Sequence, residues 1–283
     1  MVIKNVFVMG SGVMGSGIAQ VTAGAGYDVT MMDIKEEFIS KALASIEKSL
    51  DRKIKKGDIQ ESDRKSIMSR IKTTLEVKDA KDANLVVEAI PEALGLKLNV
   101  FKELDQICQE HTILATNTSA LPISAIAAAT KRQSKVIGIH FMNPVPVMKG
   151  VEIIPGRNTS NETLQLSKDF VRSLGKEPCE AKDYGGFIVS RLVDTLISEA
   201  IRCVMDGNKP EEVDKTMRLC CNFPIGPLEL CDLAGADIVL HGMETLHAEF
   251  GERFQPPPLL RSMVRSGDLG RKTGHGFYDY TPK

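Results

Sequence analysis

The first 33 residues of the chain follow the pattern of a strand, a glycine turn, a helix and a second strand. An apolar run over residues 2–9 leads into Gly10, Gly12 and Gly15, spaced as Gly-x-Gly-x-x-Gly, and a second apolar run ends at Asp33. Gly10 allows a sharp turn, Gly12 allows a ligand to approach the backbone, and Gly15 allows the helix to pack close to the strand. The segment therefore predicts a βαβ unit that begins a parallel α/β sheet.

The same segment predicts the class of ligand. A helix opening at Val13 and Met14 would direct N–H groups and positive partial charge at a pyrophosphate. The Asp33 carboxylate can accept hydrogen bonds from ribose hydroxyls, and its charge repels the 2′-phosphate that distinguishes NADP from NAD. The alternative is a glycine-rich turn that binds no ligand, but the three glycines and the acid together favour a dinucleotide. We therefore expect NAD as cofactor, contacted by Gly10, Gly12, Val13, Met14, Gly15 and Asp33.

Strand and helix patterns alternate through about residue 182. Residues 34–72 are charged and helical with a break at Gly57, which predicts a helical hairpin inserted after the second strand. Further strands are expected over 84–90, 112–116, 135–141, 151–154 and 176–180, with helices over 93–110, 123–129 and 161–174. This alternation predicts a Rossmann-like, doubly wound and mostly parallel sheet.

The pattern changes after residues 183–186, since only helical runs follow as far as about Arg265. We therefore expect an α/β NAD-binding domain over residues 1–184 and an all-α domain over residues 185–283. The longest apolar stretch, residues 187–205, contains Arg191, Asp194, Glu199 and Arg202, and four charges in one span argue for a buried or interface helix and against a membrane helix.

Composition excludes several classes of function. The 36 Lys and Arg residues balance 37 Asp and Glu residues, which argues against a general nucleic-acid or membrane-surface binder. The six cysteines are scattered without a Cys-x-x-Cys pair, as expected of reduced thiols in the cytoplasm, with no disulfide framework and no metal site. The predicted fold begins at residue 2, so we expect no signal peptide.

Three polar residues stand at predicted strand ends, where open α/β sheets bind ligands. Ser119 follows the strand over 112–116, although it or Thr118 could simply cap the next helix. His140, near the end of the strand over 135–141, could move the proton that accompanies hydride transfer at an alcohol carbon, or it could be a packed structural histidine. Glu152 lies among apolar residues and could orient His140, or it could pair with Lys149 or another base.

Three segments carry a resemblance to a known family. They are Ala115-Thr116-Asn117-Thr118-Ser119, the run Gly138-Ile139-His140-Phe141-Met142-Asn143-Pro144-Val145-Pro146-Val147-Met148, and Val151-Glu152-Ile153-Ile154. Together with residues 185–189, 226–230 and 269–278, they resemble the 3-hydroxyacyl-CoA dehydrogenase family, and most closely its short-chain 3-hydroxybutyryl-CoA dehydrogenases from butyrate-forming bacteria. The resemblance covers nearly the whole chain.

The resemblance implies roles for individual residues. His140 would be the general acid and base on the 3-oxygen of the substrate, Glu152 would pair with His140, and Ser119 would hydrogen-bond the same substrate oxygen. Asp33, Glu92, Lys97, Asn117, Asn143 and Lys272 resemble residues that contact NAD. Lys56 resembles a residue that meets the coenzyme A phosphates, with Arg52 and Lys53 as additional candidates, although a solvated surface charge is the alternative for Lys56.

One position departs from the family. Ser190 stands where the family usually has asparagine after the Gly-Phe-Ile-Val run, a residue that helps to fix His140 or the substrate carbonyl. A serine hydroxyl has a shorter reach than an asparagine amide, which offers both a donor and an acceptor. Ser190 is therefore a further catalytic candidate. Because it replaces the family asparagine, an enzyme with weakened activity stays an open alternative.

The resemblance implies NAD-dependent, reversible oxidation of (S)-3-hydroxybutyryl-CoA to acetoacetyl-CoA, with reduction as the direction in butyrate-type fermentation. It also implies an acyl-CoA substrate, a cytoplasmic location and a homodimer formed by the helical domain. Two alternatives stay open: a dehydrogenase for longer acyl chains or small hydroxy acids, and a weakly active or non-catalytic dinucleotide-binding homologue.

Overall fold

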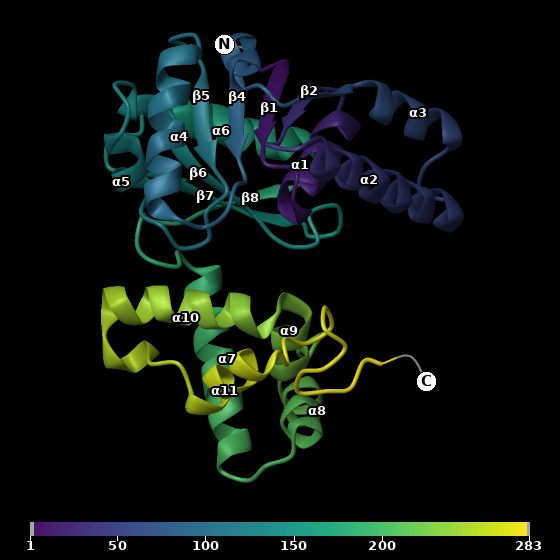
Figure 1. Ribbon diagram of the computed structural model, residues 1–283, viewed down its shortest axis with the longest axis vertical. Helices are drawn as coiled ribbons and strands as arrows, with labels where there is room; N and C mark the ends of the chain where they lie inside the picture. The colour runs from purple at the N-terminus through teal and green to yellow at the C-terminus, as the bar shows by residue number, and fades with distance from the viewer. Residues whose placement is uncertain (1–2, 282–283) are drawn as a thin grey trace. The chain divides into compact units, whose positions relative to one another are not determined.

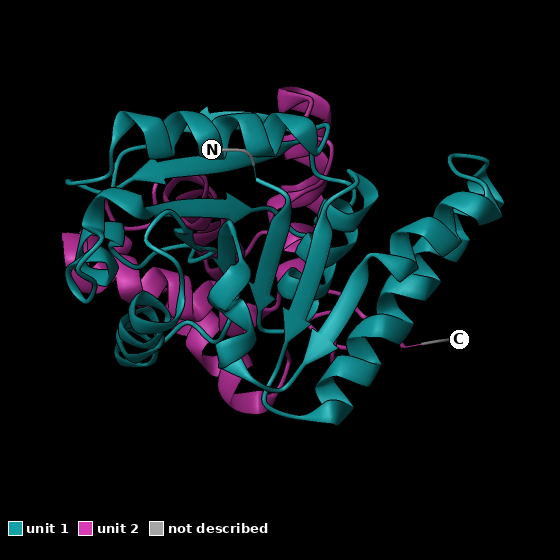
Figure 2. Cartoon of the chain, turned by 90° about the horizontal axis from the view of Figure 1, so that it is seen from above, with its two compact units in different colours: residues 1–183 teal, residues 184–283 magenta. Residues whose placement is uncertain are grey.

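The computed structural model describes residues 3–281, so Val2, the first residue of the first predicted strand, lies outside it. The chain divides into two compact units, residues 1–183 and 184–283, drawn teal and magenta in Figure 2. Unit 1 holds the sheet and unit 2 is helical (Figure 1). The predicted fold class is therefore confirmed.

Eight strands of unit 1 form one sheet in the order β3-β2-β1-β4-β5-β6-β7-β8. The strands are β1 (Asn5–Met9), β2 (Asp28–Met32), β3 (Ile71–Thr74), β4 (Leu85–Glu88), β5 (Ile113–Thr116), β6 (Val136–Phe141), β7 (Gly150–Pro155) and β8 (Glu177–Glu180). Neighbouring strands pair in parallel except for β6 and β7, which are antiparallel. The sheet is thus mostly parallel, as predicted.

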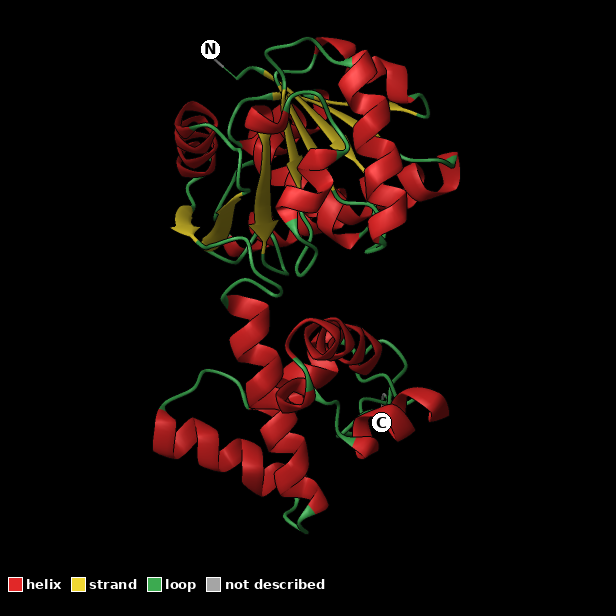
Figure 3. Cartoon of the chain, turned by 90° about the vertical axis from the view of Figure 1, so that its left-hand side faces the viewer, coloured by secondary structure: helices red, strands yellow, loops and turns green. Residues whose placement is uncertain are grey.

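Helices lie on both sides of these strands (Figure 3). They are α1 (Val13–Gly24), α2 (Glu36–Lys56), α3 (Glu61–Ser69), α4 (Leu94–Ile107), α5 (Ile123–Ala128) and α6 (Asn161–Ser173), with short 3₁₀ turns at Val77–Asp82 and Gln133–Lys135. Side chains of α1, α2 and α6 share one apolar cluster with alternate residues of the strands, such as Val6 and Val8. Intervening residues such as Phe7 are buried too, because a doubly wound sheet is covered on both faces.

The expected helical hairpin is present, but it ends earlier than predicted. Gly57 closes α2 in a left-handed conformation, φ 79°, so the turn lies where the sequence places it. Residues 71 and 72, which were expected to be helical, belong instead to edge strand β3, paired in parallel with β2. The short run Ile71-Lys72-Thr73-Thr74 carries three β-branched residues, and its pairing with β2 outweighs the helical pattern before it.

Unit 2 is built from five helices among its described residues. They are α7 (Val189–Met205), α8 (Pro210–Cys221), α9 (Pro227–Ala234), α10 (Ala236–Phe250) and α11 (Pro258–Ser266), with a 3₁₀ turn at Glu252–Phe254. Their core includes Ile197, Leu228, Val239, Met243 and Leu260. Within residues 3–281, no helix is both long enough and apolar enough to cross a membrane.

Two buried carboxylates fasten the loops of unit 2. Asp214 accepts hydrogen bonds from the Leu228 and Glu229 amides, each at 2.8 Å, and so caps α9. Asp232 accepts from the Phe277 and Tyr278 amides, each at 3.0 Å, and so holds the C-terminal segment. Both carboxylates satisfy backbone donors that would otherwise be left without partners.

Asp194 in α7 is buried against Gly242 of α10, and burial raises the pKa of its carboxyl to about 7 from an ordinary 3.8. The folded unit thus holds a proton that the unfolded chain releases above about pH 4, so this group's contribution to stability falls as the pH rises from about 4 to 7. The pKa differs by about 3 units between the folded and unfolded states, and each unit is worth about 1.4 kcal/mol. The loss in the free energy of unfolding across this pH range is therefore about 4 kcal/mol.

We therefore expect Asp194→Asn to raise the thermal unfolding midpoint of unit 2, and to raise it more at pH 8 than at pH 5. The amide keeps the shape of the protonated carboxyl without the cost of a buried charge. Calorimetry at the two pH values checks this. The same shift at both pH values would contradict it.

Candidate active site

The glycine turn between β1 and α1 is built for a close backbone approach. Gly10 has φ +97°, and a Cβ there would lie 2.6 Å from the Ala89 oxygen; a Cβ on Gly15 would lie 1.7 Å from the Gly10 oxygen. A Cβ on Gly12 would meet no protein atom within 4 Å. Gly10 and Gly15 are therefore required by the fold itself, whereas the space above Gly12 is open to a ligand.

Asp33 lies beside this turn at the end of β2. Its Oδ2 accepts hydrogen bonds from the backbone N–H and the hydroxyl of Ser11, each at 2.7 Å, and its Oδ1 accepts from the Ile34 amide at 2.7 Å. The predicted ribose-binding acid is thus fixed in place by the residue after the first glycine. Sequence reasoning missed Ser11, although a hydroxyl residue inside the motif was the available signal.

A cavity of about 740 Å³ opens over the turn, in the usual range for cofactor sites. Gly10, Gly12, Val13, Met14 and Asp33 line it together with apolar side chains of α2 and α4, including Phe38 and Leu96. An apolar wall beside an acid and a helix N-terminus suits an adenosine and a pyrophosphate. The residues present therefore fit NAD.

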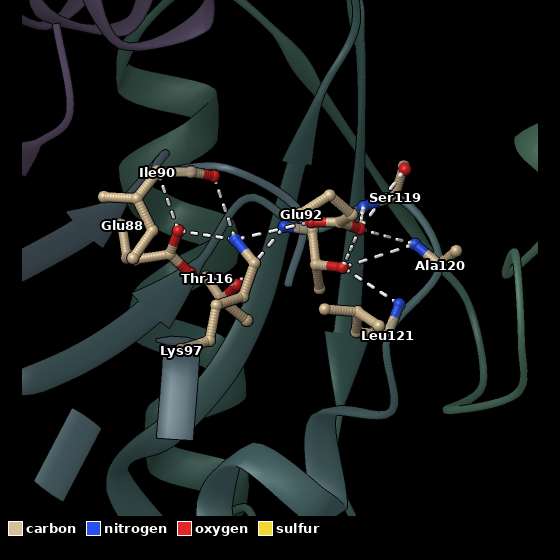
Figure 4. Close-up of polar contacts among 9 residues, drawn as sticks. Glu88, Ile90, Glu92, Lys97, Thr116, Ser119, Ala120 and Leu121 are labelled. Carbon is tan, nitrogen blue, oxygen red and sulfur yellow. Dashed lines mark hydrogen bonds and ion pairs between the residues drawn. The ribbon is translucent and has the colours of Figure 1, made fainter. Parts of the chain in front are cut away.

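A buried polar network connects the ends of β4 and β5 (Figure 4). Lys97, 1% exposed, donates to Glu88 Oε1 at 2.5 Å and lies 3.4 Å from Glu92 Oε2. Glu92 Oε1 accepts from the Thr118 hydroxyl and from the Ser119 N–H, the latter at 3.0 Å. The structure thus brings together Glu92, Lys97 and Ser119, which the sequence predicted separately.

The turn after β5 does not cap the next helix. Helix α5 starts at Ile123, and its Ile123 and Ser124 amides donate to the Asp183 carboxylate at 2.7 and 2.8 Å. Ser119 is therefore not a helix cap, which removes the alternative suggested by the sequence. Asn117, on the same turn, accepts from the Phe141 amide through Oδ1 at 2.9 Å, so its side chain ties β5 to the end of β6.

His140 and Glu152 face each other across the antiparallel strands β6 and β7. His140 Nδ1 lies 2.8 Å from Glu152 Oε2, and both side chains are buried. A carboxylate at Nδ1 fixes the ring orientation, places the Nδ1 proton and stabilises the protonated imidazole. The expected pairing of Glu152 with His140 is therefore present, and it engages Nδ1 of the ring.

The loop after β6 carries the exposed Asn143, and buried Lys176 donates from Nζ to the Val145 and Met148 oxygens, each at 2.6 Å. A second cavity, about 490 Å³, lies here and is lined by Lys53, Lys149 and Lys176. Burial and the nearby Lys53 charge lower the pKa of Lys176.

Arg52 and Lys56 are exposed on α2 and do not line this cavity. Of the three predicted cations of the hairpin, Lys53 is therefore the one that the structure places at a concave surface.

Two predicted residues belong to unit 2. Ser190 lies in the first turn of α7. Lys272 forms an ion pair with Asp237 at the start of α10, with Nζ 2.5 Å from Oδ1. The roles of Ser190 and Lys272 stay predictions.

Comparisons with known proteins agree with this geometry. The model of the 3-hydroxyacyl-CoA dehydrogenase NAD binding domain matches residues 5–184, and the model of the C-terminal domain of the same family matches residues 186–280. The chain is 47% identical to a probable 3-hydroxybutyryl-CoA dehydrogenase from Bacillus subtilis, over 100% of this chain and 99% of that protein. It is 45% identical to 3-hydroxybutyryl-CoA dehydrogenase from Clostridioides difficile, over 96% of this chain and 98% of that one.

A solved structure gives the same result. The crystal structure of (S)-3-hydroxybutyryl-CoA dehydrogenase from Ralstonia eutropha superposes with a TM-score of 0.93 at 43% identity, covering 99% of this chain and 100% of that one. Both units of the chain are therefore accounted for by one family. The chain belongs to the 3-hydroxyacyl-CoA dehydrogenase family of NAD-dependent oxidoreductases.

Proposed function

We propose that this chain catalyses the reversible oxidation of (S)-3-hydroxybutyryl-CoA to acetoacetyl-CoA. The observation that carries the proposal is the buried His140–Glu152 pair, with 2.8 Å between Nδ1 and Oε2, at the carboxyl end of β6. The four-carbon chain comes from the three relatives reported above, which are named as 3-hydroxybutyryl-CoA dehydrogenases or a probable one, and the S configuration comes from the name of the Ralstonia eutropha enzyme.

His140 moves the proton of the reaction. In oxidation, Nε2 takes the proton of the 3-hydroxyl; in reduction, the protonated ring gives it back to the 3-keto oxygen. Glu152 stabilises the imidazolium that forms, and it is buried, so water screens this charge pair little. The glycine turn and Asp33 would hold NAD, which when bound would accept the hydride that leaves C3 of the substrate.

Ser119 holds the oxygen on which His140 acts. Its backbone is fixed by Glu92, and its hydroxyl lies 3.5 Å from Glu92 Oε1, longer than a strong hydrogen bond. The hydroxyl can therefore turn to donate to the substrate oxygen at little cost. This geometry supports Ser119 as a catalytic residue.

The second cavity suits the anionic end of the substrate. Lys53 and Lys149 would meet the phosphates of coenzyme A there, while the apolar side chains Leu50 and Ile59 line the same cavity. We therefore assign Lys53 a more direct contact with coenzyme A than Lys56 or Arg52.

An optical assay of NADH oxidation with acetoacetyl-CoA tests the proposed function. We expect turnover with NADH, and a kcat/KM with NADPH lower by about 100-fold, because Asp33 would meet the 2′-phosphate. NADH binding without oxidation would favour a non-catalytic homologue. Faster turnover of longer acyl chains, or activity retained without the coenzyme A moiety, would overturn the assignment of acetoacetyl-CoA as the substrate.

We expect Ser190→Asn to raise kcat while changing the KM for acetoacetyl-CoA less. An asparagine amide at this position of α7 restores a hydrogen-bonding group that the family usually has, worth about 1–3 kcal/mol, or about 5- to 150-fold. Steady-state kinetics on both proteins measure the effect. Equal kcat values would contradict the prediction.

We also propose a cytoplasmic homodimer that acts on a small-molecule substrate and binds neither nucleic acid nor membranes. The exposed apolar side chains of unit 2, among them Leu192, Leu219 and Ile238, are candidates for burial between two copies. Light scattering coupled to size exclusion should give twice the 30.9 kDa of one chain. A mass of 30.9 kDa at micromolar concentration would exclude the dimer.

A further inference from the structure

Glu88 ends β4 and is completely buried, yet the reaction as described does not use it. Its Oε1 accepts from Lys97 Nζ at 2.5 Å and from the Ile90 amide at 2.8 Å, and its Oε2 accepts from the Thr116 hydroxyl at 2.7 Å. A buried carboxylate is costly unless such partners compensate it, so each of these contacts has to be made. Glu88 is therefore held rigidly by two central strands of the sheet.

The ammonium of Lys97 connects Glu88 to a second carboxylate. Its Nζ lies 3.4 Å from Glu92 Oε2, while the other oxygen of Glu92 accepts from the Ser119 and Ala120 amides at 3.0 and 3.3 Å (Figure 4). Glu92 stands on the irregular segment between β4 and α4, and the Thr118 hydroxyl also donates to its Oε1. One lysine thus shares its charge between two carboxylates, at 2.5 Å from Glu88 and 3.4 Å from Glu92.

We propose that Glu88 is a positioning residue for Ser119 and acts through Lys97 and Glu92. Lysine is a long chain with several rotatable bonds, and Glu88 holds its ammonium at one place. That ammonium sets where Oε2 of Glu92 lies, and Glu92 in turn sets the turn that presents the Ser119 hydroxyl. Without the Glu88 charge, Lys97 can move fully onto Glu92 and draw its carboxylate away from the Ser119 amide.

The inference rests on the proposed function, because it requires that the Ser119 hydroxyl meets the substrate oxygen. Its test is a double-mutant cycle of Glu88→Gln and Ser119→Ala, with kcat for acetoacetyl-CoA measured at saturating NADH. Glutamine keeps the size of Glu88 and removes its charge. If Glu88 acts through Ser119, the two substitutions are not additive.

We expect Glu88→Gln to lower kcat by about tenfold or more in the otherwise unchanged chain, and by less than about threefold in the Ser119→Ala background. NADH affinity, measured by fluorescence, and the unfolding midpoint are recorded for every variant. Asp105→Asn is the matched control, since Asp105 is a carboxylate whose side chain is only 9% exposed and which accepts from one cation, Arg132 Nε at 2.6 Å, and one amide, Lys131 N at 2.8 Å. Asp105→Asn should lower the unfolding midpoint about as much as Glu88→Gln does, and should leave kcat within about twofold of that of the unmodified chain.

Equal losses of kcat in both backgrounds, or no loss at all, would overturn the inference while leaving the dehydrogenase intact. Absence of acetoacetyl-CoA reduction by the unmodified chain would instead overturn the proposed function. If Glu88→Gln does not fold, Glu88→Asp takes its place in the cycle, because it keeps the charge and shortens the reach to Lys97. Additive losses with Glu88→Asp would overturn the inference equally.

Discussion

Replacing His140 by alanine is expected to lower kcat for acetoacetyl-CoA reduction by about 10²- to 10⁴-fold, the usual range for loss of a general acid. The reason is the His140–Glu152 pair, since a carboxylate at Nδ1 orients the ring and stabilises the imidazolium that gives up the proton. Steady-state kinetics with both substrates saturating measure the change.

The affinity for NADH, measured by fluorescence, should stay within about threefold in the same variant, because His140 lines neither the glycine turn nor the 740 Å³ cavity. His111→Ala is the matched control. His111 is an exposed histidine just before the amino end of β5, whereas His140 lies near the carboxyl end of the neighbouring parallel strand β6. A loss of kcat smaller than tenfold for His140→Ala, or an equal loss for His111→Ala, would refute the role of His140.

Gly12→Ala is expected to weaken NADH binding by about 10- to 100-fold, or about 1.4–2.8 kcal/mol, with little change in the unfolding midpoint. The backbone of Gly12, at φ −61° and ψ −169°, is allowed for alanine, and the new Cβ would meet no protein atom. The methyl group would instead occupy the space that we assign to the pyrophosphate. Fluorescence titration and thermal unfolding separate the two effects.

Two other glycines bracket this result. Gly24→Ala, at the far end of α1, places its Cβ 3.8 Å from Ile67 Cδ1 and should change neither property. Gly15→Ala forces a Cβ to 1.7 Å from the Gly10 oxygen and should lower both stability and NADH affinity. Unchanged NADH affinity in Gly12→Ala would show that the cofactor does not approach this backbone.

Local patterns were enough to predict the α/β class and the glycine turn, while the pairing of His140 with Glu152 followed from the family resemblance, since local patterns left Lys149 or another base as an alternative partner. Parallel strands bring their carboxyl ends to one edge, so residues at those ends can be placed before the structure is known. Strand β3 could not be predicted in this way, because it is a four-residue edge strand directly after a helix and only its pairing with β2 defines it.

Long-range polar contacts were the other part that local patterns could not give. Asp183 caps α5 from 60 residues away, and Glu88 meets Lys97 and Thr116 from other elements. The local sequence around an acid at the end of an apolar strand is the same whether the acid binds a ligand, faces water or pairs with a buried lysine. Only the packed fold distinguishes these cases.

The reversal of chain direction at β7 makes the spacing of the catalytic pair a matter of loop length. His140 and Glu152 are directly opposed in the register of β6 and β7, and the residues between the strands, 142–149, set that register. Successive residues of a strand point to opposite faces, so a shift of one residue would turn the Glu152 carboxylate to the other side of the sheet. The length of this segment therefore matters more than the identity of its residues. A single deletion there would separate Glu152 from His140 without changing either residue.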